Sequence, residues 1–237
     1  MPELVLWDND IAFKMACYQL AERAIATHTD ASIPPAMLAV GQHVIRQKLA
    51  RHARVRDISA AQLAFKHLVQ TITSIEPTEC EVELASDIER QAARASLDLD
   101  IGESQLLAIL HTRGYHSLIT GDKRAIIAIS AVAREIALKR IRSLEQLISQ
   151  ITMSTDVAVM RQKICAEPMI DKALSACFGC ASGADLSDQD VFDGLNSYIE
   201  DLRRKAPDIL VDAFQYKSPS APPEEKLQTV HEELRPD

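Results

Sequence analysis

Short apolar runs alternate with longer helical patterns along the first two thirds of the chain. The first run, Leu-Val-Leu-Trp at residues 4–7, ends at the polar triplet Asp-Asn-Asp at residues 8–10. A continuous apolar run of this length is typical of a strand that is buried on both faces, as in a parallel sheet. A helical pattern follows at once, from Ile11 to about Thr27. The chain therefore opens with a strand–loop–helix unit that places carboxylates at the carboxyl end of the strand.

The same alternation continues to about residue 151. We predict a second main strand over His116–Thr120, a short strand over Leu138–Ser143, and a connection at Ser74–Thr78 that has room for another short strand. The predicted helices cover residues 36–52, 60–73, 79–95, 103–113, 123–137 and 144–151. Strands that alternate with helices indicate a parallel sheet, and right-handed crossovers bring the carboxyl ends of its strands to one edge. The sequence thus predicts an α/β fold with a central, mainly parallel sheet flanked by helices.

The last third of the chain has a different, helical pattern. One candidate helix covers Asp156–Cys177 with an interruption near Pro168, and another begins after Ser187 as N-cap and runs to about Lys205. Residues 218–237 hold four prolines among charged residues, a composition typical of disordered segments. We therefore divide the chain into an α/β domain over residues 1–151, a helical extension over 152–216 and a disordered tail over 217–237.

Composition and charge narrow the class of protein. Of the 237 residues, 47% are hydrophobic and 25% are charged, which is typical of a soluble globular protein. No apolar stretch reaches the roughly 18 residues of a membrane span, and the N-terminus lacks the pattern of a signal peptide, so we expect a cytoplasmic protein without a membrane partner. The formal net charge of −8 counts against a nucleic-acid partner, unless local basic segments decide the binding.

The cysteines predict reduced thiols. There are five of them, an odd and scattered set, which is typical of a reducing compartment and not of a disulfide framework. Cys177 and Cys180 have the spacing of a zinc knuckle, but a closed zinc site needs four ligands and no second pair follows. We expect two ordinary thiols at these positions.

Acidic residues recur where the predicted topology brings loops together. Asp8 ends the first strand, Glu103 opens a helix, and Asp122 ends the second main strand, with Asp10 and Asp100 close by in sequence. Clustered carboxylates repel one another unless a cation neutralises them, and Mg²⁺ prefers such oxygen ligands. Each acid taken alone is also a common turn or helix-cap residue. Their joint placement is what predicts a metal site that could activate water against a phosphodiester.

Three segments resemble the motifs of the PIN-domain family. Residues 4–11, LVLWDNDI, resemble its opening strand and acidic turn. Residues 99–108, LDIGESQLLA, resemble the LDxGE segment of one subgroup, and residues 118–125, LITGDKRA, resemble the strand end of that same subgroup. The motifs keep the family's order, and the likeness covers about residues 3–151.

The resemblance implies a parallel sheet between helices and a ribonuclease that uses Mg²⁺ or Mn²⁺. Asp8, Glu103 and Asp122 match the family's metal positions, Asp10 matches the neighbouring polar position, and Asp100 matches the acid of LDxGE. Many bacterial members are toxins of toxin–antitoxin pairs. The resemblance therefore implies RNA as substrate, a role as toxin or antiviral effector, and an antitoxin or other protein as partner. The amphipathic pattern over Thr155–Phe214 leaves three roles open for the extension: covering the domain, recruiting a partner or forming a homodimer.

One departure from the family favours a second hypothesis. The family usually supplies another acid from a helix between the first strand and the GE segment, but residues 35–56 contain no Asp or Glu and offer Gln42, His43 and His52 instead. Without that acid the metal site would be weaker or would depend on Asp10 or Asp100. The alternative function is a catalytically weak or inactive PIN-like module that binds protein or RNA.

Two basic segments are the candidates for contacts with nucleic acid. The first comprises Arg46, Lys48, Arg51, Arg54 and Arg56, and the second comprises Lys123, Arg124, Arg134, Lys139, Arg140 and Arg142. Lys and Arg contacts to phosphates supply most of the sequence-independent affinity for nucleic acid. Lys123 and Arg124 adjoin Asp122, so we expect them to hold substrate phosphate. The first segment is also what a solvated helix face would contain, and the sequence leaves both interpretations open.

Overall fold

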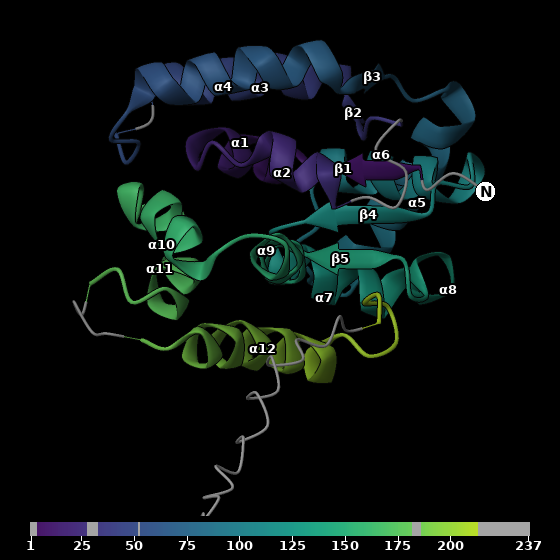
Figure 1. Cartoon of the computed structure of the whole chain (residues 1–237). Helices are drawn as coiled ribbons and strands as arrows, with labels where there is room; N and C mark the ends of the chain where they lie inside the picture. Colours follow the sequence, from purple (N-terminus) through teal and green to yellow (C-terminus); the bar gives the residue numbers. More distant parts are fainter. Residues whose placement is uncertain (1–3, 28–32, 52, 182–185, 213–237) are drawn as a thin grey trace, which may run out of the picture.

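A five-stranded, all-parallel sheet forms the centre of the protein. The computed structural model describes residues 4–27, 33–51, 53–181 and 186–212. The strand order is β3-β2-β1-β4-β5, and every pair of neighbours is parallel (Figure 1). The strands are β1 (Val5–Trp7), β2 (Ala36–Leu38), β3 (Thr73–Ile75), β4 (Ser117–Thr120) and β5 (Ile141–Ser143). The predicted α/β class is confirmed.

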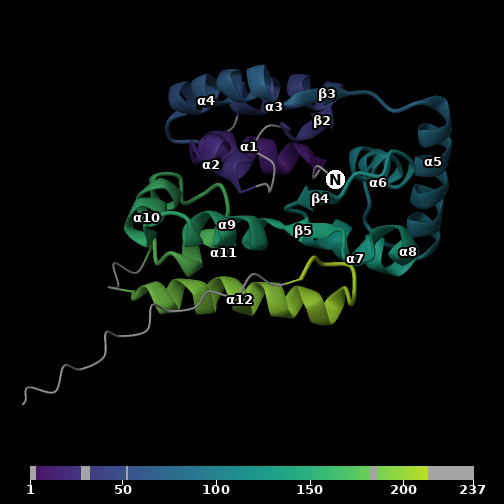
Figure 2. The same cartoon turned by 45° about the vertical axis from the view of Figure 1, so that its right-hand side comes forward.

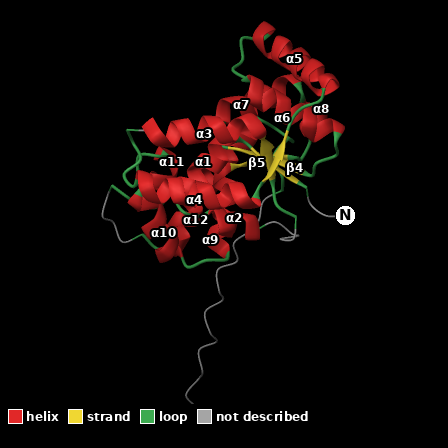
Figure 3. Ribbon diagram, turned by 90° about the horizontal axis from the view of Figure 1, so that it is seen from above, coloured by secondary structure: helices red, strands yellow, loops and turns green. Residues whose placement is uncertain are grey.

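Helices cover both faces of this sheet, which gives three layers as in PIN-like folds (Figures 1 and 3). The helices that precede β4 in sequence are α1 (Asn9–Cys17), α2 (Ala21–Ala26), α3 (Ala39–Arg51), α4 (Ile58–Thr71), α5 (Glu79–Arg94) and α6 (Ile101–Thr112). Those that follow it are α7 (Lys123–Val132), α8 (Arg134–Ala137), α9 (Leu144–Met153), α10 (Val157–Ala166), α11 (Lys172–Cys177) and α12 (Asp188–Lys205).

Strand β1 shows why its apolar run is continuous. Val5 and Trp7 join the core formed with α1 to α4 and α9 to α11, whereas Leu6 joins the core formed with α5 to α8. Successive side chains of a strand point to opposite faces, so a strand covered on both sides needs apolar residues at every position. All three side chains are buried, as the sequence predicted.

Three predicted helices were wrong in part, and one of them, predicted over 123–137, is divided into α7 and α8 at Ala133. The helix predicted from residue 36 begins only at Ala39, because residues 36–38 form β2 between β1 and β3. Pro34 and Pro35 hold the preceding backbone extended, and Thr73 N–H donates to the Pro35 carbonyl at 2.9 Å, which favours a strand over a local helix. The helix predicted over 11–27 is divided into α1 and α2 at Gln19, whose φ of 54° is left-handed.

The C-terminal helices pack against the α/β part of the chain. Helices α9 to α12 lie along one side of the sheet (Figure 2), and Leu174, Phe178 and Phe192 belong to the same apolar core as Trp7. The chain then returns to the sheet, where Leu210 forms a parallel bridge with Ile141. Within the described ranges, no helix is long and apolar enough to cross a membrane. The tail predicted over residues 217–237 lies outside the described residues.

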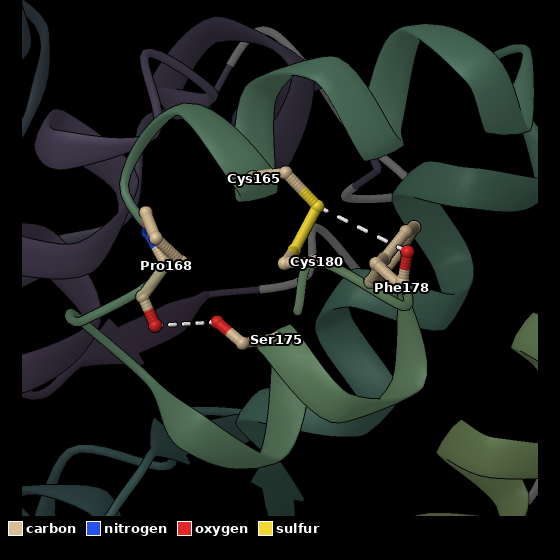
Figure 4. Close-up of a disulfide and its surroundings, with 5 residues drawn as sticks. All are labelled: Cys165, Pro168, Ser175, Phe178 and Cys180. Atoms are coloured by element: carbon tan, nitrogen blue, oxygen red, sulfur yellow. Dashed lines mark hydrogen bonds between the residues drawn. A yellow bond between two sulfur atoms is a disulfide. The ribbon is translucent and has the colours of Figure 1, made fainter. Parts of the chain in front are cut away.

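A disulfide corrects the prediction that all thiols are reduced. Cys165 and Cys180 are bonded, with their Cα atoms 5.0 Å apart (Figure 4). The turn between α10 and α11 brings them together, and no sequence spacing reveals that distance. Cys177 is a free, buried thiol. The zinc-knuckle spacing therefore has no zinc role here, because the Cys180 sulfur is already bonded to another cysteine.

The loop that this disulfide closes carries two carboxylates that contact the α/β part. Glu167 is buried and accepts hydrogen bonds from the backbone N–H groups of Arg56 and Asp57, both at 2.7 Å. Asp171 reaches the ammonium of Lys14 at 2.8 Å. The disulfide-closed loop is thus tied both to the start of α4 and to the helix that follows β1.

Candidate metal site

All five predicted acids line one cavity at the carboxyl edge of the sheet. The cavity measures 580 Å³ and is open to solvent. Its acidic lining comprises Asp8, Asp10, Asp100, Glu103, Asp122 and Asp171. The first five come from the loops after β1 and β4 and from the start of α6, and the arrowheads of β1 and β4 point the same way (Figure 1). Parallel strands bring these loop residues, which are up to 114 positions apart in sequence, to one edge.

Asp8 is a buried acid that directly follows β1. It caps α1: one carboxylate oxygen accepts from the Asn9 N–H at 2.6 Å, and the other accepts from the Thr120 hydroxyl at 3.2 Å. Burial, together with the negative charge of Asp10, raises the pKa of Asp8 to about 6. Its carboxylate therefore gains from any neighbouring positive charge.

Glu103 is held in the cavity by a capping box at the start of α6. The Glu103 N–H donates to Asp100 at 2.8 Å, and the Asp100 N–H donates to the Glu103 carboxylate at 3.0 Å. Burial raises the pKa of Glu103 to about 8, and the charges of Asp100, Asp8 and Asp122 act in the same direction. At neutral pH this side chain holds a proton unless a cation replaces it.

Asp122 caps α7 and is paired with Arg124. Its carboxylate accepts from the Arg124 N–H at 2.8 Å and from the Ala125 N–H at 3.3 Å, and the Arg124 guanidinium lies 3.3 Å away. Burial acts to raise the pKa of Asp122, but the hydrogen bonds and charge of Arg124 outweigh it and hold the pKa below its usual value. Asp122 is therefore charged more readily than Asp8 and Glu103.

Two residues of the site were missed in the sequence. The Lys14 ammonium lies inside the cavity, 2.7 Å from Asp10 and 2.8 Å from Asp171. Lys14 stands one helical turn after Asp10, a spacing that could have indicated the pair. Asp171 comes from α11, 49 positions after Asp122 in sequence, and nothing in the sequence placed it here.

The two cations expected to hold phosphate differ in their surroundings. The Arg124 side chain is 73% exposed and also contacts Asp98 at 3.2 Å, so it is accessible to a ligand. The Lys123 ammonium instead contacts the buried carboxylate of Glu145 at 2.6 Å and lies 4.3 Å from the centre of the Tyr198 ring. A ligand would have to compete with the buried Glu145 for Lys123, and with the more exposed Asp98 and Asp122 for Arg124.

The oxygen atoms of the residues that line the cavity are suited to a hard divalent cation. Six carboxylates line the cavity, together with Asn9. Mg²⁺ and Mn²⁺ prefer such oxygens and keep several waters of their own. Among the residues with described positions, no group of three or more His, Cys, Asp or Glu side chains is arranged to hold a metal ion. No protein-family model, curated protein or solved structure matches this chain.

Proposed function

We propose that this protein is a metal-dependent endoribonuclease that hydrolyses phosphodiester bonds. The observation that carries the proposal is the convergence of Asp8, Glu103 and Asp122, with Asp10 and Asp100 beside them, in one solvent-open cavity. Burying carboxylates together is unfavourable, and the raised pKa values of Asp8 and Glu103 express that cost. A cation that these acids bind together is the best explanation for the arrangement.

Asp8, Glu103 and Asp122 would hold Mg²⁺ or Mn²⁺, with Asp10 and Asp100 as neighbouring oxygen donors. A bound cation of this kind supplies an activated water and neutralises charge on the phosphodiester. Arg124 is the exposed cation at the rim, so its guanidinium is suited to hold a phosphate oxygen. Lys123 is the second phosphate candidate, restrained by Glu145. RNA as the substrate, and a role as toxin or antiviral effector with a protein partner, rest on the resemblance to PIN domains.

A cleavage assay with matched variants tests this proposal. The full chain is incubated with labelled single-stranded RNA and Mn²⁺ or Mg²⁺, and with EDTA in a parallel reaction. We expect EDTA to abolish cleavage and Asp8→Asn and Asp122→Asn to slow it by about 100-fold or more, the scale of losing one preorganised electrostatic group. Asp87→Asn is the control, because Asp87 lies on the exposed face of α5 and pairs only with Arg90 among the described residues. Cleavage at the control's rate by both site variants would refute the site assignment.

The second hypothesis, a catalytically weak PIN-like binding module, is favoured by helix α3. This helix contributes Val44 and Lys48 to the cavity, where the family usually supplies an acid. Calorimetric titration separates the two hypotheses. Binding of Mn²⁺ in the millimolar range or tighter, lost in Asp122→Asn, supports the nuclease, whereas no detectable binding supports the module.

A further inference from the structure

Positive charge is concentrated on one pair of helices. Residues 33–75, which include α3 and α4, hold six Lys and Arg residues and a single acid, in a chain whose formal net charge is −8. The one acid, Asp57, accepts from the Ala60 N–H at 2.9 Å as the cap of α4. Helix α4 itself carries no acid at all. Because the basic residues are gathered on one part of the surface, the local electrostatic potential there is positive although the net charge of the chain is negative.

A groove of 460 Å³ runs between these two helices. Its floor is apolar, formed by Leu49, Phe65 and Val69, and its rim carries the exposed side chains of Arg46, Lys66, Gln62 and Gln70. Among the described residues, neither Arg46 nor Lys66 has an acidic partner within 4.0 Å, in contrast to Lys14 and Lys123 in the acid cavity. The groove therefore presents unpaired positive charge beside an apolar surface.

Helix α3 joins this groove to the acid cavity. Val44 and Lys48 line the cavity, while Arg46 and Leu49 of the same helix line the groove. An α-helix is about 10 Å across with its side chains, and phosphates along one strand of a nucleic-acid helix are spaced about 3.4 Å apart along the axis. An unstacked single strand advances further per nucleotide than this axial rise, so a strand whose phosphate lies at the acids would reach the groove within about three nucleotides.

We propose that the α3–α4 groove binds single-stranded RNA, a few nucleotides from the phosphodiester that lies at the acid cavity. The ligand class rests on the proposed function. Arg46 and Lys66 contact phosphates, the apolar floor packs against a base, and the amides of Gln62 and Gln70 hydrogen-bond to base edges. Unpaired bases are needed for these contacts, because the bases of a duplex are stacked and paired. The surface supplies the cations, apolar contacts and amides that a single strand uses, whereas an acidic peptide would use only the cations.

Binding is measured in the Asp122→Asn background, so that cleavage does not consume the probe. A fluorescein-labelled single-stranded RNA oligonucleotide is titrated with the full chain across a series of NaCl concentrations. We expect Arg46→Gln/Lys66→Gln to weaken binding at least ten-fold and to reduce the slope of log K against log salt by about 1.4, since each single-strand phosphate contact contributes about 0.7. We expect Gln62→Ala/Gln70→Ala to weaken binding several-fold without changing the slope, because amides release no counterions.

The control variant is Arg204→Gln/Lys205→Gln, which removes the same charge from α12, where both side chains pair with Asp201. Equal effects of the control and of Arg46→Gln/Lys66→Gln would overturn the groove proposal, as would competition by polyglutamate as strong as that by unlabelled RNA. Normal melting curves of all variants exclude misfolding as the cause. If the groove variants behave as expected while the wild-type chain never cleaves RNA, only the nuclease proposal fails. If the chain cleaves RNA but the groove variants change neither Kd nor KM, only the groove proposal fails.

Discussion

The Lys14–Asp171 pair gives the sharpest quantitative prediction. The Lys14 side chain is only 10% exposed, and its ammonium lies between Asp10 at 2.7 Å and Asp171 at 2.8 Å. Asp171→Asn removes one negative charge and keeps the shape of the side chain. The cap of α11 survives this change, because the Asp171 carboxylate accepts from the Leu174 N–H at 3.0 Å and an Asn oxygen caps a helix equally well. The variant therefore isolates the charge.

The expected loss of stability follows from burial. Removing one partner of a fully buried ion pair costs about 3–5 kcal/mol, and an exposed pair contributes about 0–1 kcal/mol. Lys14 keeps Asp10 in the variant, so we expect a loss of about 2 kcal/mol, between these limits. For a chain of this length that corresponds to a Tm lower by about 4–8 °C. Lys14→Met leaves both carboxylates without the ammonium, and its loss should lie at about 3–5 kcal/mol.

The pH dependence of the loss has a definite sign. Burial acts to raise the pKa of Asp171, but the charge and hydrogen bond of Lys14 outweigh it and hold the pKa below the usual value. A depressed pKa means that the stabilisation is present above the unfolded pKa of about 3.9 and is lost as the pH falls below it. The difference in stability between wild type and Asp171→Asn should therefore shrink as the pH falls below about 4.

Urea titrations followed by the fluorescence of Trp7 provide the assay. Trp7 is the single tryptophan and is fully buried next to Asp8 in sequence, so its emission reports on the core at the site. Asp87→Asn, in the exposed pair with Arg90, is the matched control. A double-mutant cycle with Lys14→Met should give a coupling energy above about 1 kcal/mol. A loss for Asp171→Asn within about 0.5 kcal/mol of the control would refute the reasoning.

Two further predictions concern regions outside the site. Glu81→Gln should cost about 2–3 kcal/mol at pH 7, because its buried carboxylate accepts from Arg113 and Thr112. Arg113 holds the pKa of Glu81 near 2, so the stabilisation is present above about pH 4.5 and is lost toward pH 2; denaturation at pH 7 and pH 3 checks this, and an equal loss at both would contradict it. Replacing Cys165 and Cys180 with serine should cost about 3 kcal/mol, the entropy of closing a loop of this length. Calorimetric melting checks that loss against the exposed Cys80→Ser, and equal Tm values for the two variants would contradict it.

The sequence predicted those parts of the fold that depend on local pattern. Strands β1 and β4 were predicted because burial on both faces requires uninterrupted apolar residues, and the acids at their ends followed from the geometry of parallel strands. Strand β2 was missed, because Ala36–Leu38 continues smoothly into the pattern of α3. Its extended form depends on pairing with β1 and β3, which are distant in sequence.

The part of the site that could not be predicted comes from the C-terminal helices. Asp171 enters the cavity because α10 and α11 fold back on the α/β part, fixed by the Cys165–Cys180 bond and by Glu167. None of these contacts has a characteristic spacing along the chain. A sequence motif reveals residues whose place is set by one strand–loop–helix unit. The place of Asp171 is set by tertiary packing instead.

A net charge of −8 argues against RNA binding, but the positions of the charged residues remove this objection. The exposed acids of α5, Glu79, Glu83 and Asp87, lie on the opposite side of the sheet from α3 and α4. Ile88 of α5 and Leu49 of α3 belong to different cores, and Figures 2 and 3 place α5 away from the other two helices. The sheet lies between α5 and the pair α3 and α4. Because each helix is about 10 Å across, the axis of α5 lies roughly 20 Å from the axes of α3 and α4. The Debye length at physiological ionic strength is about 8 Å. A phosphate chain on α3 and α4 is therefore attracted by Arg46 and Lys66 while salt screens it from α5, and raising the salt concentration should weaken binding without reversing its dependence on the groove.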